Sequence, residues 1–164
     1  MISTTELRER LVEIEASYIA ETDTIKALLL AKLAALEVGG WTEECIDKIV
    51  IDFLDARNPR CRAKVLDRLN SIYGFQYGKE FRSIMVELVG VVGFEKIEDK
   101  LPLQCQQLES ALAELKQSRD KCAHTYTKPT TAIDAPTKML GLLAKIETVL
   151  KLFSAELHSV QLHP

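Results

Sequence analysis

The chain has 164 residues, a length that fits one domain with a single hydrophobic core. Apolar residues make up 47% and charged residues 27%, which excludes a disordered chain. The 21 basic and 24 acidic residues give a net charge of -3, so a polyanion must bind to a local basic patch. The longest charge-free apolar stretch, Leu88–Phe94, is far shorter than the ~20 residues of a membrane helix. Because the N-terminal segment is charged throughout and predicts no signal peptide, we expect one domain over residues 1–164, located in the cytoplasm.

The four cysteines are spread along the chain without a CxxC pair. Apart from their even number, nothing is typical of a secreted protein, so we expect reduced, structural thiols. Cys122 and His124 are close in sequence but have no second half-site at ligand spacing, which argues against zinc. Motifs for nucleotide hydrolysis, dinucleotide binding, zinc proteolysis and α/β-hydrolase chemistry do not occur. We therefore expect neither a metal nor another cofactor.

Apolar residues recur at helical spacing through the N-terminal half. A first helix is predicted after the capping residues Ser3–Glu6 and carries Leu7, Leu11, Ile14 and Tyr18. The pattern resumes at Ile25, Leu29, Leu33 and Leu36 and is predicted to end at Gly39–Gly40. Residues 21–24 indicate either a break or a solvated turn of one long helix. A further helix is predicted to begin at Thr42 and end before Pro59, with Cys45, Ile49, Phe53 and Leu54 inward.

The C-terminal half is also helical in pattern. Two shorter helices are predicted over residues 61–73 and 79–89, and the run VELVGVVGF is interpreted as a helix end with a glycine turn. Two longer helices then show strict 4-3 spacing, one at Leu101, Cys105, Leu108, Leu112, Leu115, Arg119, Cys122 and Tyr126, the other at Met139, Leu143, Ile146, Leu150, Phe153, Leu157 and Val160. A polar loop with Pro129 and Pro136 separates them. We expect an all-α antiparallel bundle of about five to seven helices, since such seams pack within a bundle or across a dimer.

Arg119 interrupts an otherwise apolar seam. A guanidinium keeps its charge in a protein, so it must contact an anion or reach water. One interpretation is structural, with the side chain extending to solvent or pairing with a glutamate of a neighbouring helix. The other is functional and depends on the residues that follow.

Asp120 and His124 are four positions apart and therefore share one face of the helix. The carboxylate can accept a hydrogen bond from the imidazole, and a helix end before Pro129 also favours imidazolium. An acid–base histidine beside an arginine is suited to attack on a phosphodiester. Arg119 and His124 are about 140° apart around an ideal helix. They converge only through the length of arginine, a distorted helix end or a second subunit.

The stretch SRDKCAHTY, from Ser118 to Tyr126, resembles the signature of HEPN domains. It contains R-x4-H, as RDKCAH, with a polar residue after the arginine and a position near the end of a long helix. The remaining chain is similar to the RiboL-PSP-type branch of this family. In that branch an early helical pair precedes GGWTEECIDKIV, FQYGKEFRSIM, the motif helix and a final helix. The resemblance covers most of the chain.

This resemblance implies a metal-independent endoribonuclease that acts as a homodimer with a composite active site. His124 is then expected to assist proton transfer as the RNA 2′-hydroxyl attacks the adjacent phosphate. Arg119 is expected to stabilise charge on that phosphate, and Asp120 to orient the histidine or the arginine. The implied products carry a 2′,3′-cyclic phosphate and a 5′-hydroxyl. The implied role is that of a toxin or an anti-phage effector, with an antitoxin protein as a further partner.

Tyr126 and several basic residues are further candidates. R-x4-H-x-Y resembles HEPN toxins paired with nucleotidyltransferase antitoxins, which implies nucleotide addition at Tyr126, although this residue also completes the apolar seam and fits a packing role. The candidate RNA contacts are Lys116, Lys121 and Lys128 around the motif, and Arg57, Arg60 and Arg62 in a basic run that also fits a solvated helix face. The expected partners are RNA and a second copy of the chain, not DNA or a membrane.

The alternative is a HEPN-like helical module that dimerises and binds RNA or a protein partner without cutting it. If the chain is an enzyme, Arg119→Ala and His124→Ala are predicted to abolish cleavage and to leave helicity and dimerisation nearly intact. In the module, neither residue matters more than any other interface position.

Overall fold

A computed structural model describes residues 2–57, 62–69, 71, 74–123 and 133–160 of the chain. The elements in this part are α1 (Thr5–Ala20), α2 (Thr24–Arg57), α3 (Arg62–Leu69), a π-helical turn η2 (Tyr77–Phe81), α4 (Arg82–Lys100), α5 (Pro102–Ala123) and α6 (Pro136–Ser159). No strand occurs among the described residues, and the predicted all-α class is confirmed. None of the described helices is long and apolar enough to cross a membrane.

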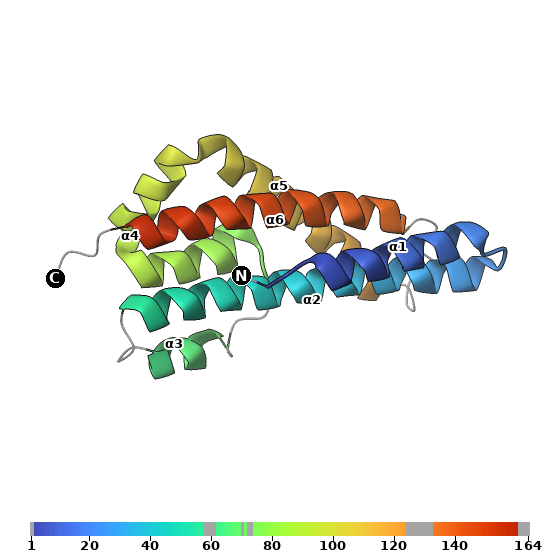
Figure 1. Ribbon diagram of the computed structural model, residues 1–164, viewed down its shortest axis with the longest axis horizontal. Coiled ribbons are helices and arrows are strands. Elements are labelled where there is room, and N and C mark those ends of the chain that lie inside the picture. The colour runs from blue at the N-terminus through green and yellow to red at the C-terminus, as the bar shows by residue number, and fades with distance from the viewer. Residues whose placement is uncertain (1, 58–61, 70, 72–73, 124–132, 161–164) are drawn as a thin grey trace.

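Helix α2 is the central helix of the bundle. It contacts α1, α5 and α6, and less extensively α3 and α4. Figure 1 shows α1 and the N-terminal half of α2 lying side by side as a hairpin that projects beyond the start of α6. At the other end of the molecule, α4 lies beside α6 and α3 lies on the outside of α2.

The predicted seams of α5 and α6 form a large part of the core, beside the buried face of α2. From α6, the buried side chains of the seam are Met139, Leu143, Ile146, Leu150, Phe153 and Leu157, and from α5 they are Cys105, Leu108, Leu112, Leu115 and Cys122. Phe153 lies at the centre of an aromatic group, with ring centroids 4.9 Å from Phe81 and 5.8 Å from Phe94. Since burying one such side chain is worth ~1.5–3 kcal/mol, these seams hold the two longest C-terminal helices together.

Helix α2 runs unbroken through Gly39–Gly40, so the predicted helix end at this point was wrong. A glycine inside a helix costs only about 1 kcal/mol relative to alanine, which the packing of a 34-residue helix outweighs. At Gly39 a Cβ atom would lie 3.5 Å from Cδ of Arg119 and 3.9 Å from Cε1 of Phe75. The glycine therefore lets these two side chains approach the α2 backbone closely.

The sequence predicted that Thr42 begins and caps a helix, but this prediction was wrong because Thr42 lies inside α2. Its hydroxyl, buried inside α2, donates to the carbonyl oxygen of Val38 one turn back at 2.7 Å. The chain does break between Ala20 and Thr24, which settles the alternative that the sequence left open. There the side chain of Asp23 accepts a hydrogen bond of 2.8 Å from the backbone N–H of Ile25 and so caps α2.

In the N-terminal half of α2 the small residues are buried, whereas one row of large aliphatic residues is exposed. Ala31, Ala34, Ala35 and Val38 are buried. The predicted apolar pattern is exposed instead, by 70% at Ile25, 56% at Leu29, 42% at Leu33 and 53% at Leu36. We call these four residues the α2 stripe. The pattern predicted the helix correctly, but the face that it marks does not pack on the core.

Helix α4 bends at Gly90, whose φ of 74° and ψ of 166° lie outside the helical region. Glycine adopts this left-handed backbone at low cost because it has no Cβ atom. The glycine turn predicted for VELVGVVGF therefore exists, but it is a kink. The helix continues beyond it to Lys100, whereas the sequence predicted an end at Val89.

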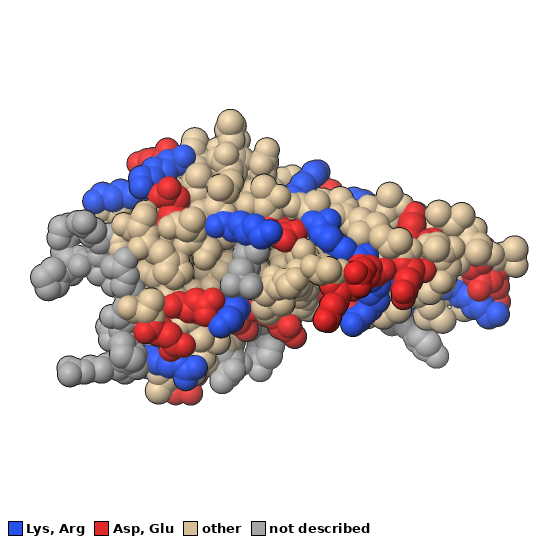
Figure 2. Space-filling model, in the orientation of Figure 1, with Lys and Arg blue, Asp and Glu red and all other residues tan. Residues whose placement is uncertain are grey.

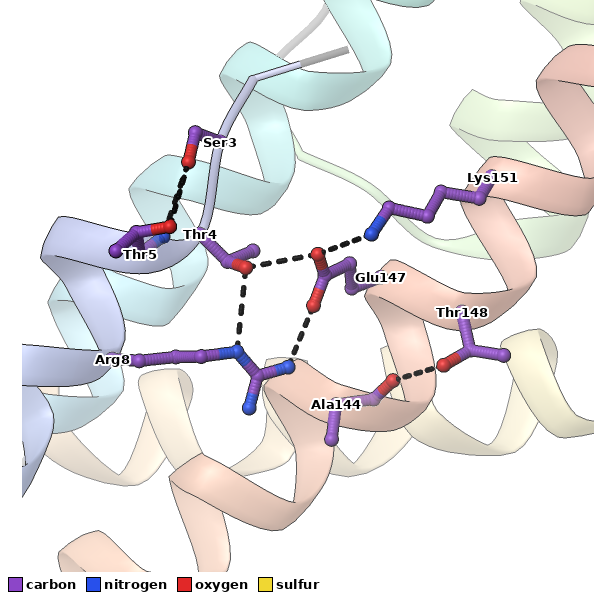
Figure 3. Close-up of polar contacts among 8 residues, drawn as sticks. All are labelled: Ser3, Thr4, Thr5, Arg8, Ala144, Glu147, Thr148 and Lys151. Atoms are coloured by element: carbon purple, nitrogen blue, oxygen red, sulfur yellow. Dashed lines mark hydrogen bonds and ion pairs between the residues drawn. The ribbon is translucent and has the colours of Figure 1, made fainter.

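An ionic network centred on the largely buried Glu147 attaches the first turn of α1 to α6 (Figure 3). Glu147 on α6 accepts hydrogen bonds from Thr4 Oγ1 at 2.9 Å, Arg8 Nη2 at 2.6 Å and Lys151 Nζ at 2.7 Å. Thr4 is the N-cap residue of α1, but its hydroxyl bonds to this glutamate and makes no capping bond. The network replaces a local cap with a contact between distant parts of the chain.

Glu147 is expected to make the stability of the fold depend on acid pH. Burial alone raises the pKa of Glu147, but the hydrogen bonds from Lys151, Arg8 and Thr4 outweigh it and bring the pKa from 4.5 to about 2. Because the folded pKa is the lower one, the stabilisation is complete above pH 4.5 and is lost as the pH falls to about 2. At ~1.4 kcal/mol per pH unit this shift corresponds to about 3.5 kcal/mol, which solvent screening at the exposed Lys151 reduces to roughly 2–3 kcal/mol. Urea unfolding at pH 7 and pH 2.5 measures it.

The test variant is Glu147→Gln. Its matched control is Glu109→Gln, because Glu109 is an exposed glutamate of α5. Glu147→Gln should lower the free energy of unfolding at pH 7 and have little effect at pH 2.5. The Glu109 variant should follow the wild type at both values. Equal losses at both pH values in the Glu147 variant would contradict this assignment.

Candidate functional site

Arg119 crosses from α5 to α2. Its Nη1 atom lies 2.7 Å from Oε1 of Glu43, and its guanidinium lies over the Phe75 ring, 4.8 Å from the centroid. The arginine side chain is 29% exposed and the glutamate 39%. The charge that interrupts the seam of α5 therefore finds an anion on a neighbouring helix and still reaches solvent. A partly exposed pair of this kind contributes ~0–1 kcal/mol, and the aromatic contact a similar amount.

A pocket of about 340 Å³ opens beside this arginine, between α2, α5 and residues 74–84. Its charged lining consists of Arg119, Glu43, Asp47 and Glu80. Burial, followed by repulsion from Glu43 and Glu44, raises the pKa of Asp47. With three carboxylates and one guanidinium, the pocket carries an excess of negative charge. Additional positive charge is needed before a phosphate is attracted to it.

Asp120 lies on a different side of α5 from Arg119. Its carboxylate pairs with Lys116 one turn earlier at 2.5 Å. Both residues line a second pocket of about 560 Å³, together with Gln76, Tyr77, Gly78, Glu109, Ala113, Gln117 and Lys121. Adjacent helix residues diverge by about 100°, which places Arg119 and Asp120 in separate hollows. The carboxylate that orients the arginine is that of Glu43, although the sequence had offered Asp120 for this role.

Ser118 and Asp134 connect the end of α5 to the start of α6. The Ser118 hydroxyl, 1% exposed, donates to Oδ2 of Asp134 at 2.6 Å. Lys138 and Lys121 lie 3.2 Å and 3.9 Å from the same carboxylate. The hydrogen bond from Ser118 and these lysines together lower the pKa of Asp134 despite its burial. The contact fixes the two chain segments on either side of residues 124–132.

The remaining predicted site residues fall into two groups. His124, Tyr126, Lys128 and Arg60 lie outside the described residues; α5 ends at Ala123, directly before the histidine. Arg57 is the last residue of α2, and Arg62 begins α3 and pairs with Asp55 at 2.8 Å. Arg57 is about 21 Å beyond Glu43 along α2, so the basic run lies at the C-terminal end of this helix, whereas Arg119 contacts its middle.

Charges of both signs intermingle on the face of the molecule in Figure 2. This agrees with a local rather than a general attraction for polyanions. Cys45, Cys105 and Cys122 are buried, and burial is the main reason why the pKa of each is raised. A raised pKa disfavours the reactive thiolate. In the described part of the chain, no three side chains of His, Cys, Asp or Glu gather as metal ligands.

Comparison with protein-family models, curated proteins and solved structures finds no match to this chain. The site is therefore interpreted from its own residues and from the resemblance of its motif. Glu43, Phe75 and Asp134 are the contacts that sequence reasoning missed. Ser118 stands in the motif itself, but nothing in the sequence indicated that it is buried or that it bonds to Asp134.

Proposed function

We propose that this chain is a metal-independent endoribonuclease of the HEPN type that acts on RNA as a homodimer. The observation that carries the proposal is the placement of Arg119. Glu43 and Phe75 hold its guanidinium partly exposed beside a pocket, and His124 follows α5 directly. In the cytoplasm such an activity fits a toxin or an anti-phage effector that an antitoxin protein restrains.

The proposed reaction uses the nucleophile that RNA itself provides. The 2′-hydroxyl oxygen attacks the adjacent phosphorus, the bond from phosphorus to the 5′-oxygen breaks, and His124 moves the proton between these two oxygens. Arg119 stabilises the extra negative charge on the phosphate as it passes through the five-coordinate state. The strand is left with a 2′,3′-cyclic phosphate on one side and a 5′-hydroxyl on the other.

The acidic lining of the Arg119 pocket gives Glu43 a positioning role in this proposal. It holds the guanidinium at the pocket in the free protein, and the RNA phosphate then competes with it for Arg119. Lys116 and Lys121, in the second pocket, are placed to supply positive charge along the strand. Asp120 pairs with Lys116 and acts on that part of the surface.

A second candidate is the helical module that binds RNA or a protein without cutting. The observation in its favour is the same arginine, since Glu43 and Phe75 already give it an ionic and an aromatic contact. Under this alternative Arg119 is a structural link between α2 and α5.

The deciding experiment incubates the purified protein with end-labelled transfer, messenger and ribosomal RNA in excess EDTA. The ribonuclease should cut without added metal and leave ends that resist a phosphatase until the cyclic phosphate is opened by acid. Absence of cutting by the folded protein on all three RNA classes would reject the proposal and leave the binding module.

A further inference from the structure

The α2 stripe is a helix face that no described part of the chain covers. Its four large aliphatic side chains are 42–70% exposed and extend over about 16 Å of the helix. The opposite face of the same turns is buried and packs on the core through alanines. Ile19, near the end of α1, is also 73% exposed. Contiguous surface of this kind is typical of a protein interface.

The stripe leads directly to the candidate site. At helical spacing its face continues from Leu36 through Gly40 to Glu43 and Asp47, which line the Arg119 pocket. One edge is bounded by α1, where Arg10 pairs with Glu37 at 2.7 Å. The other edge is bounded by the end of α5, from which Arg119 reaches Glu43. A partner on the stripe would therefore contact the site at its border.

The surface beside Leu36 is hollow. A space of about 400 Å³ there is lined by Ile2, Ser3, Glu6, Leu7, Arg10, Leu36, Glu37, Gly40, Trp41 and Glu44. A Cβ atom added at Gly40 would have no neighbouring side chain within 4 Å, so the hollow is open above this glycine. The hollow has room for a large apolar side chain from a partner.

The charges along α2 indicate which partner fits. Lys26 and Lys32 lie among the residues of the stripe, whereas Glu43, Glu44 and Asp47 follow it. The mutual repulsion of these carboxylates contributes to the raised pKa of Asp47. A partner that brings lysines to the acidic end and carboxylates to the basic end would relieve this repulsion. A second α2 in the antiparallel direction has this distribution, and a parallel one would oppose like charges.

We propose that the α2 stripe binds the α2 stripe of a second copy of this chain, antiparallel and about a two-fold axis between residues 34 and 35. In this register Leu33 packs on Leu36 of the partner subunit, and Leu29 enters the hollow at the partner's Gly40. Lys26 meets Glu44 of the partner subunit, since both residues are exposed and lie on one edge of the helix, about five whole turns apart. The proposal deepens the proposed function by naming the surface of its homodimer, but the association needs no nuclease activity.

The pairing would bring positive charge to the acidic end of α2. It places Lys26 of the partner subunit beside Glu44, which lines the hollow on the α1 edge of the stripe. The Arg119 pocket lies on the opposite edge, where α5 meets α2, so the seam runs past this pocket without filling it.

The first test measures mass in solution by light scattering and sedimentation, without RNA, at ~1–100 µM protein. The wild type should be a dimer, and Leu33→Glu and Leu36→Glu should raise its dissociation constant more than ~100-fold. Leu152→Glu is the matched control, because Leu152 on α6 is exposed by the same 42% as Leu33 but lies outside the stripe. Circular dichroism should show equal helicity in all variants.

The second test is a charge reversal that reports on the register. Lys26→Glu and Glu44→Lys should each weaken the dimer ~10-fold, and the double variant should restore it. These residues are five turns apart in one chain, so rescue requires contact between subunits. A monomeric wild type, a dimer that tolerates glutamate at Leu33, or a double variant without rescue would each overturn the proposal. Because no RNA is present, its failure is distinguishable from failure of the ribonuclease proposal.

Discussion

Replacing His124 with alanine is expected to lower RNA cleavage in EDTA by a factor of about 10²–10⁴. The reason is the reaction itself, since without metal a protein group must take the proton of the 2′-hydroxyl and return one to the leaving oxygen. His124 is the histidine of the motif, and the sequence predicts it near a helix end before Pro129, where the negative end of the helix favours a protonated imidazole. The rate of cleavage against pH should therefore be bell-shaped in the wild type, and His124→Ala should flatten it.

His158→Ala is the control for this experiment. The ring of His158 lies on α6, where Nδ1 is 2.7 Å from the carbonyl oxygen of Ser154 and the ring contacts Phe53 edge on. Its removal should cost some stability and leave the cleavage rate per folded molecule unchanged. Undiminished cleavage by the His124 variant would remove this residue from the reaction.

The sequence was a reliable guide where each helix buries one continuous apolar face. In α6 the residues at 4-3 spacing from Met139 to Leu157 are all buried, because this helix lies between α1, α2, α4 and α5. The all-α class follows from the same regularity. Local hydrophobic spacing suffices for such helices, since any arrangement of the bundle has to cover the same stripe.

In the first half of α2, hydrophobic spacing does not show which face of the helix is buried. Both of its faces are apolar, one through Ala31, Ala34 and Ala35 and the other through the larger residues of the stripe. Size alone favours burial of the leucines, but the small residues let neighbouring helices approach α2 more closely. Gly39 has the same effect for Arg119 and Phe75, and a packing contact of this kind cannot be distinguished from a helix stop in one sequence.

The candidate site was predictable only in part for a similar reason. The motif arginine and its helix were identified locally, and a glutamate on a neighbouring helix was among the partners considered. Which glutamate it is depends on the relative rotation of α2 and α5. Glu43 is 76 residues from Arg119 in the chain, and no local pattern links them.

Arg119→Ala is expected to lower cleavage by a factor of about 10²–10³, the usual cost of removing a group that stabilises charge in a transition state. Glu43→Gln is its counterpart, because it removes the charge of the same ion pair but keeps a side-chain oxygen that accepts a hydrogen bond from the guanidinium. This variant should keep cleavage within a few-fold of the wild type and bind RNA more tightly, since the pocket then loses one negative charge. Single-turnover rates and KM measure the two effects separately.

The same two variants separate the ribonuclease from the binding module by comparing activity with stability. A partly exposed pair contributes ~0–1 kcal/mol, so Arg119→Ala and Glu43→Gln should lower the free energy of unfolding by similar small amounts, and the double variant by less than their sum. If Arg119 is only a link between α2 and α5, the two variants must also behave alike toward RNA. Equal stability with a cleavage difference of ~100-fold would assign the arginine to chemistry. Parallel behaviour in both measurements would assign it to the fold.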